Sequence, residues 1–301
     1  MLFITNRLPK GSWVTKIGRE FIFDLRSNSP SASVYFCNYD ENNKKSTELG
    51  SGEFLVRLSE SEEENILFYI HGFHNTPEMV LNSAGRLSEQ CKLLGQVLVI
   101  PVIWPCSAHF GIINKYYDDV ASANHSSLAF SRALKIYQES QISVRKRTHV
   151  LAHSMGNRVL QHTLNEFSAT NKSETVFENI FLVSADIASD ALEMGKAGEA
   201  ICRMGERVIV YYAKDDRALN VSIYANFINE RGFGKRLGDE GPSDLTRMLK
   251  HVYCFDCSSY NNAEENSLGH SYFISTRANN VTIVLRHILS CITHSDVVPS
   301  L

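Results

Sequence analysis

Six short apolar runs, each followed by a stretch with helical periodicity, constrain the fold of this chain more than any other feature. A continuous apolar run of strand length is typical of a strand buried on both faces of a parallel sheet. Regular alternation of such strands with helices indicates the α/β class. The runs are Ile66–Ile70, Val97–Ile103, Thr148–His153, Ile180–Val183, Val208–Tyr212 and Val252–Phe255. The sequence therefore predicts a doubly wound, mostly parallel sheet.

Helical patterns fill the gaps between these runs. Pro77–Leu94 places proline in the first turn and repeats apolar residues on one face. A second helix is expected directly after Ser154, and a last one over about 280–293. The buried face of the second helix is expected to hold Val159, Leu160, Leu164 and Phe167.

The first sixty residues follow a different pattern. Three segments alternate apolar and polar residues as half-buried strands do, and polar stretches rich in Ser, Asn and Gly separate them. These segments are Glu20–Leu25, Ser33–Cys37 and Phe54–Leu58. We expect them to form antiparallel N-terminal edge strands.

Length, charge and hydropathy limit the class of protein. The chain has 301 residues, 44% of them hydrophobic, which fits a single domain over residues 1–301. A net charge of −3 without a basic block predicts no nucleic-acid partner. No apolar run approaches the length of a spanning helix, so no stable membrane insertion is expected. The apolar first residues are too short for a signal peptide, which predicts a cytoplasmic protein.

The seven cysteines are spread through apolar segments, as expected of buried thiols in a reducing compartment. Cys254 and Cys257 have the spacing of half a zinc site. A complete site needs a second pair or nearby histidines at ligand spacing, and none follows closely. We therefore expect no metal and interpret the two cysteines as core residues at a strand end.

The segment around Ser154 has the pattern of a nucleophile elbow. A buried strand runs into this serine and a helix follows at once, which would present the hydroxyl at the top of the sheet. Small residues, Ala152 and Gly156, lie two positions before and after it, where neighbouring backbone packs closely. The alternative interpretation is a serine N-cap on an ordinary helix.

Residues downstream of Ser154 supply the rest of a catalytic triad. A serine nucleophile needs an imidazole base and a carboxylate that orients the base, and α/β hydrolases order them as serine, acid, histidine. His270 follows the last strand and is the best candidate base. Asp216, past the second strand after the elbow, is favoured as the acid over Asp186. Asp215 is a further candidate.

An oxyanion hole is expected at the end of the first apolar run. Acyl transfer requires two backbone amides that meet the developing oxyanion, one of them from the residue after the nucleophile. These requirements assign the hole to Met155 and Phe73. Gly72 would let the backbone approach the substrate, and His71 is expected to brace the loop by hydrogen bonds.

Two stretches, about 106–124 and 230–244, fit neither strand nor helix cleanly and are candidate lids. Aromatic residues gather in or beside the first of them. They are Trp104, Phe110, Tyr116 and Tyr117. Such a group suits an apolar acyl chain, which slightly favours lipid-like esters over small polar ones.

Taken together, these motifs resemble a bacterial domain-of-unknown-function branch of the α/β-hydrolase superfamily, which is described as esterase- or lipase-like. The similarity covers about residues 65–275. The matching segments are Tyr69–Phe73, Trp104–Pro105, Tyr117 with Ala121–Ser126, Ala152–Arg158, Asp215–Leu219 and Gly269–Tyr272. The resemblance implies the α/β-hydrolase fold and a Ser-His-Asp hydrolase, without assigning a substrate.

The leading hypothesis is therefore a serine hydrolase that acts on a small-molecule ester or related acyl bond and needs no cofactor. An acyltransferase, thioesterase or amidase would use the same residues. A catalytically idle hydrolase-fold binding module is the hypothesis from a different class.

Overall fold

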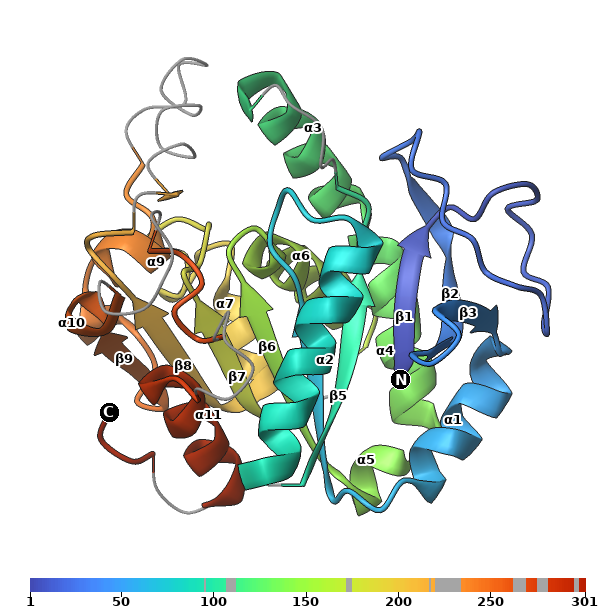
Figure 1. Ribbon diagram of the computed structural model, residues 1–301. Helices are drawn as coiled ribbons and strands as arrows, with labels where there is room; N and C mark the ends of the chain where they lie inside the picture. Colours follow the sequence, from blue (N-terminus) through green and yellow to red (C-terminus); the bar gives the residue numbers. More distant parts are fainter. Residues whose placement is uncertain are drawn as a thin grey trace.

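Within the described part of the chain, nine strands form one sheet in the order β3-β2-β1-β5-β4-β6-β7-β8-β9 (Figure 1). The computed structural model describes residues 1–94, 96–106, 112–171, 175–216, 218–219, 234–261, 269–274, 281–294 and 298–301. The strands are β1 (Leu2–Arg7), β2 (Pro30–Asp40), β3 (Lys45–Glu48), β4 (Asn65–Ile70), β5 (Val97–Ile103), β6 (Arg147–His153), β7 (Phe177–Val183), β8 (Gly205–Tyr212) and β9 (Val252–Asp256). Strands β2 and β3 pair antiparallel, as do β1 and β2, and the remaining pairs are parallel. The predicted mostly parallel sheet with an antiparallel edge is confirmed.

All six apolar runs are strands, β4 to β9. The reason is visible in β4, in which every residue is buried. Side chains of Phe68 and Ile70 enter the core on one face of the sheet, whereas those of Leu67 and Tyr69 enter the core on the other. Burial on both faces removes the polar alternation that a half-exposed strand shows.

Helices cover both faces of the sheet. They are α1 (Gly50–Glu60), α2 (Pro77–Leu94), α3 (Ile112–His125), α4 (Ser127–Glu139), α5 (Ile142–Arg145), α6 (Gly156–Thr170), α7 (Glu199–Met204), α9 (Leu237–Glu240), α10 (Ser258–Asn261) and α11 (Ile283–Thr293), with a 3-10 turn at Leu245–Arg247. Helices α2 and α11 contribute to the core on one face; α1, α4, α6 and α7 contribute to the other (Figure 1). Among the described residues, no helix combines the length and hydropathy needed to cross a bilayer.

Two of the predicted helices have the expected positions. Helix α2 has the predicted bounds, and α6 buries the four predicted residues. The last helix begins at Ile283, where the Thr282 hydroxyl caps it by accepting a hydrogen bond from the Leu285 amide at 3.0 Å. Residues 275–280, where its beginning was expected, lie outside the described residues.

The prediction of a strand over Phe54–Leu58 is wrong, because this segment lies within α1. Phe54 and Leu58 are four residues apart, so a helix buries both on one face. On the exposed side, Arg57 pairs with Glu53 at 2.8 Å. Five residues fit either periodicity, and tertiary packing decides between them.

The N-terminal strand assignments also differ from the prediction. Glu20–Leu25 forms no strand and contributes only isolated bridges, such as the one between Glu20 and Thr47. In contrast, β1 was not predicted, although it lies between β2 and β5 and every one of its residues is buried. Ser33–Cys37 is part of β2, as expected.

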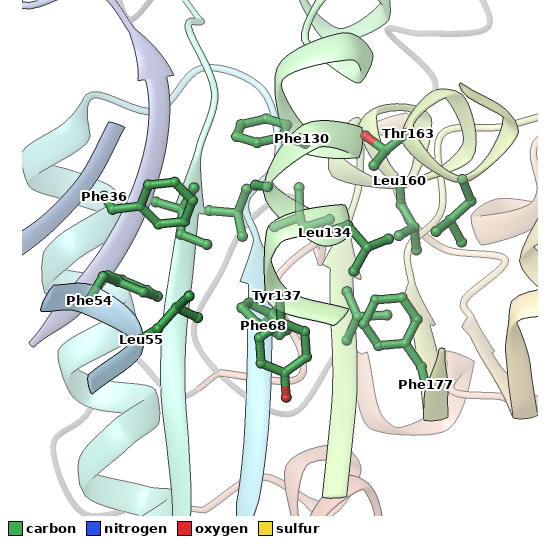
Figure 2. Close-up of a pocket in the computed structure, with 16 residues that line it drawn as sticks. Phe36, Phe54, Leu55, Phe68, Phe130, Leu134, Tyr137, Leu160, Thr163 and Phe177 are labelled. Carbon is green, nitrogen blue, oxygen red and sulfur yellow. The ribbon is translucent and has the colours of Figure 1, made fainter. Parts of the chain in front are cut away.

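An apolar cavity of about 60 Å³ lies between the sheet and helices α1, α4 and α6 (Figure 2). Its volume is several times that which one water molecule needs, but an apolar lining leaves such a cavity dry. The hydroxyl of Tyr137 points away to Thr148, at 2.7 Å. The buried hydroxyl of Thr163 has no hydrogen-bond partner among the described residues.

Candidate active site

Ser154 occupies the sharp turn between β6 and α6, in the left-handed region with φ of +53°. Hydrogen bonds fix this turn from both sides. The Ser154 amide donates to the Val183 oxygen at 3.0 Å, and its carbonyl oxygen accepts from the amide of Asp186 at 3.2 Å. A non-glycine residue in this region is strained by about 1–3 kcal/mol and persists only where the surroundings enforce it. Such strain is the property expected of a nucleophile elbow.

Close backbone approaches explain the two glycines near Ser154. A Cβ atom on Gly156 would lie 2.5 Å from the Ile70 oxygen and 2.6 Å from the His71 oxygen. A Cβ atom on Gly72 would lie 2.9 Å from the Cβ of Ser154. The end of β4 is therefore pressed against the elbow, and the loop that follows β4 lies beside the serine.

Asn157 braces the same turn, a role that the sequence analysis missed. Its buried side-chain amide donates to the main-chain oxygens of Ala152 and Ser154, each at 3.0 Å, and of Val183 at 3.3 Å. The side chain thus ties the end of β6 to the end of β7. An asparagine three residues after the candidate nucleophile was the available signal.

The side chains of His270 and Asp216 meet directly. Nδ1 of His270 lies 2.8 Å and 2.9 Å from the two carboxylate oxygens of Asp216. Asp216 is fully buried, and the amide of Ala218 donates to it at 3.1 Å. With Nδ1 committed to the carboxylate, the Nε2 atom of His270 is the one left to accept a proton.

His270 is also held through its main chain, beside the elbow. Its carbonyl oxygen accepts a hydrogen bond from Nε2 of His153 at 3.0 Å and from the Ser184 hydroxyl at 3.3 Å. The ring centroids of His153 and His270 are 4.7 Å apart. Burial, and secondly the proximity of His270, lower the pKa of His153 to about 3, so this ring stays neutral. Sequence reasoning found neither contact.

His71 braces the loop after β4. One ring nitrogen, Nδ1, contacts the Gly72 oxygen at 2.7 Å, while Nε2 accepts from the Trp104 amide at 3.2 Å. Burial lowers the pKa of His71 to about 4, which keeps it neutral. The Trp104 indole stacks on this ring and donates to the His71 oxygen at 2.8 Å. Trp104, expected in or beside the first candidate lid, is buried and supports this loop.

The two amides assigned to the oxyanion hole come from elements that meet at Ser154. Met155 immediately follows the serine, and Phe73 follows Gly72, whose close approach to Ser154 is described above. Among the described residues, neither amide donates a hydrogen bond to a main-chain oxygen outside the helices and strands.

Asp186, the alternative acid, lies next to the elbow with other partners. The Tyr116 hydroxyl donates to its carboxylate at 2.8 Å, and Nε of Arg236 lies 3.3 Å from it. Both charged side chains are buried. The Tyr116 ring also packs edge-on against Phe73, with centroids 6.0 Å apart. Asp186 thus joins α3 to the segment before α9, whereas Asp216 contacts the histidine.

The two candidate lids are ordered elements over their described parts. Helix α3 fills most of 106–124 and rises above the C-terminal edge of the sheet (Figure 1). In the second stretch, the Gly238 amide donates to the Ala185 oxygen at 2.9 Å, which packs α9 against the segment after β7. Residues 107–111, including Phe110, and 230–233 lie outside the described residues.

The described side chains offer no cluster of three or more His, Cys, Asp or Glu that could hold a metal ion. All seven cysteines are free thiols. Cys257 is buried, and Cys254 is half-buried. The groups at this site, a serine hydroxyl and an imidazole paired with a carboxylate, are of the kinds that act as nucleophile and general base.

Comparisons with known proteins agree with this fold. A family described as alpha/beta hydrolase of unknown function (DUF900) matches residues 44–287. A search of curated proteins returns no match.

Three solved structures show weak similarity at low sequence identity. Lipase B of Aspergillus fumigatus has a TM-score of 0.35 and 12% identity, over 67% of this chain and 46% of that one. A lipase-esterase related protein of Clostridium acetobutylicum has a TM-score of 0.32 and 8% identity, over 65% and 86%. TT1662 from Thermus thermophilus has a TM-score of 0.33 and 10% identity, over 64% and 80%. The match thus spans less than half the length of the Aspergillus lipase.

Proposed function

The chain belongs to the α/β hydrolases of unknown function (DUF900), and on that premise we propose that it is a serine hydrolase that cleaves a carboxylic ester or a related acyl bond. The observation that carries the proposal is the Asp216–His270 pair, held beside a serine in a strained strand-to-helix turn. A buried carboxylate on Nδ1 orients the imidazole and stabilises the imidazolium that forms during attack.

In the proposed reaction, Oγ of Ser154 forms a bond to the substrate carbonyl carbon while His270 takes the hydroxyl proton at Nε2. The amides of Phe73 and Met155 bind the oxyanion. Collapse of the tetrahedral intermediate breaks the bond to the leaving group, which receives the proton from His270. Water, activated in the same way, then releases the acyl group from Ser154.

The surroundings favour an apolar acyl group. Phe73, Tyr116 and Tyr117 form a chain of edge-on aromatic contacts from the proposed oxyanion loop to α3. Aromatic and apolar walls with few polar groups are typical of small-molecule sites. Transfer to another acceptor, or cleavage of a thioester or amide, would use the same residues.

Reaction with an alkyl fluorophosphonate tests the proposed nucleophile. We expect one covalent adduct by intact mass, mapped to Ser154 by peptide sequencing and absent in Ser154→Ala. A folded protein without an adduct would contradict the proposal and favour the idle binding module. A panel of p-nitrophenyl esters of graded chain length then identifies the preferred acyl group.

A further inference from the structure

The loop between β1 and β2, residues 8–29, exposes an unusual number of large apolar side chains. Among the described residues, five of the thirteen exposed large apolar side chains lie on this N-terminal loop. They are Trp13, Val14, Ile17, Ile22 and Leu25. The exposed fraction reaches 74% for Ile17 and 65% for Trp13. Scattered exposed apolar residues are ordinary, but a concentration of them marks an interaction surface.

The structure holds the backbone of this loop in place: Phe21 is buried in the core, while the five exposed side chains face outward. The Tyr35 hydroxyl donates to the Trp13 oxygen at 2.5 Å, and the Gly18 amide donates to the Glu48 oxygen at 2.7 Å. Glu48, itself buried, accepts from the Lys16 amide at 3.0 Å and pairs with Arg19 at 2.7 Å. Hydrogen bonds therefore fix the main chain at and beside Trp13 and Ile17, and this fixed backbone holds both side chains in an exposed position.

The base of the loop is anchored as firmly. Arg7, at the end of β1, is buried, and its guanidinium donates to the main-chain oxygens of Asp24, Ser27 and Cys106 at 2.9–3.1 Å. Arg7 thus fixes the point at which the loop leaves β1, beside β1 and β2 (dark blue in Figure 1).

Basic side chains lie among the apolar ones. The loop carries four basic and two acidic residues, a net charge of +2, although the whole chain carries −3. Lys10 and Lys16 are exposed, and the Arg26 side chain is 83% exposed. Tryptophan and aliphatic side chains combined with lysine are characteristic of segments that lie in the interface of a membrane. Lysine, in contrast, is depleted in protein–protein interfaces.

We propose that the N-terminal loop docks the protein reversibly on an anionic phospholipid surface, with Trp13 and Ile17 in the interface and Lys10 and Lys16 on the headgroups. Attachment of this kind needs no spanning helix, because apolar burial and charge attraction act together. It does not depend on the proposed hydrolase reaction, so the two can fail separately.

Tryptophan fluorescence of the full chain provides a direct test. The chain has two tryptophans, and Trp104 is buried, so a blue shift on addition of vesicles reports Trp13. We expect this shift with vesicles of phosphatidylcholine and phosphatidylglycerol, but not with phosphatidylcholine alone. Trp13→Phe should abolish the shift while co-sedimentation with the vesicles persists.

Co-sedimentation measures the contribution of each group. Trp13→Ser with Ile17→Ser should weaken binding at least about tenfold, and Lys10→Gln with Lys16→Gln about fivefold per charge. Matched controls are Leu93→Ser and Leu245→Ser, which alter exposed leucines elsewhere and should bind as the parent does.

Three results would overturn the proposal. One is a parent protein that does not sediment with anionic vesicles at low ionic strength. Another is unchanged binding by the Trp13→Ser, Ile17→Ser variant. The third is a vesicle-free dimer in sedimentation equilibrium that this variant converts to a monomer, which would assign the surface to a second copy of the chain.

Discussion

Nε2 of His153 donates to the main-chain oxygen of His270 at 3.0 Å, so the residue that precedes the proposed nucleophile holds the loop that carries the proposed base. The positions of the two reacting groups are thus coupled through one side chain. A shift of the β6 end would move both together.

Replacing His153 tests this coupling. His153→Phe removes the donor and should lower kcat by about 10- to 100-fold, because misplacement of a catalytic group by about 1 Å costs that much. His153→Gln can still donate and should recover part of the loss. Steady-state kinetics, and the rate of fluorophosphonate labelling, provide the readout. A higher KM with unchanged kcat would show that His153 acts on substrate binding instead.

The two aspartates near the elbow should respond differently to loss of charge. Asp216→Asn removes the acceptor of the His270 proton, and we expect kcat to fall by about 10³- to 10⁴-fold. Asp186→Asn leaves Arg236 buried without its counter-charge, so it should reduce the free energy of unfolding by about 3 kcal/mol. Labelling per folded molecule should change much less. The reverse pattern would identify Asp186 as the acid.

Gly156 should be intolerant of any side chain. Gly156→Ala places a Cβ atom 2.5 Å from the Ile70 oxygen, and we expect a loss of about 1–3 kcal/mol in urea unfolding together with slower labelling of Ser154. Gly52→Ala is the matched control, since Gly52 lies in α1 with open space around it. That control should be neutral or stabilising by up to about 1 kcal/mol.

The cavity beneath α4 and α6 predicts a stabilising substitution. Thr163→Val removes a buried hydroxyl that lacks a partner and should raise the free energy of unfolding by about 1 kcal/mol. Thr148→Val, in contrast, removes the partner of the Tyr137 hydroxyl and should lower it by a similar amount. Urea unfolding measures the free energy of unfolding of the two variants, provided that its dependence on urea concentration is the same in both. Equal effects would show that Thr163 has an unseen partner.

Buried neutral histidines should make the protein sensitive to acid. Burial lowers the pKa of His71 to about 4 and those of His149 and His153 to about 3, against 6.5 as the ordinary value. Between these values the unfolded chain binds more protons, so stability falls as pH drops from about 6.5 to about 4. Each group contributes up to about 1.4 kcal/mol per pH unit.

Urea unfolding at a series of pH values measures this slope. His149→Gln should reduce this slope by about the contribution of one histidine. An unaltered slope in His149→Gln would mean that this ring is already charged in the folded protein.

The fold was predictable from the sequence where a strand consists of a continuous run of buried apolar residues. Strands β4 to β8 are almost wholly buried on both faces, so their apolar runs were sufficient, whereas β9, the edge strand, is only partly buried and kept its apolar run. Strand β1 is as fully buried as β4 but ends in Thr5, Asn6 and Arg7. Each of these side chains donates a hydrogen bond to a residue about a hundred positions away, such as Ile103, which accepts from the Thr5 hydroxyl at 2.7 Å. No local pattern reveals such partners.

In the candidate site, too, some residues could be predicted from the sequence and others could not. Chain order was enough to propose Ser154, Asp216 and His270, because the hydrolase fold places residues after successive strands at one edge. The supports of the site, His153 and Ser184, act through contacts with a main-chain atom 117 and 86 residues away. The choice between Asp216 and Asp186 likewise depends on which loop reaches the imidazole.

Strand β1 has a consequence for any truncated version of the protein. The family match begins at residue 44, yet β1 lies inside the sheet, with Ile4 and Thr5 beside Val102 and Ile103 of β5. A fragment trimmed to the matched segment would lose this strand and leave the β5 edge open. Unpaired amides and carbonyls along such an edge are a template for aggregation, so residues 1–43 complete the folding unit.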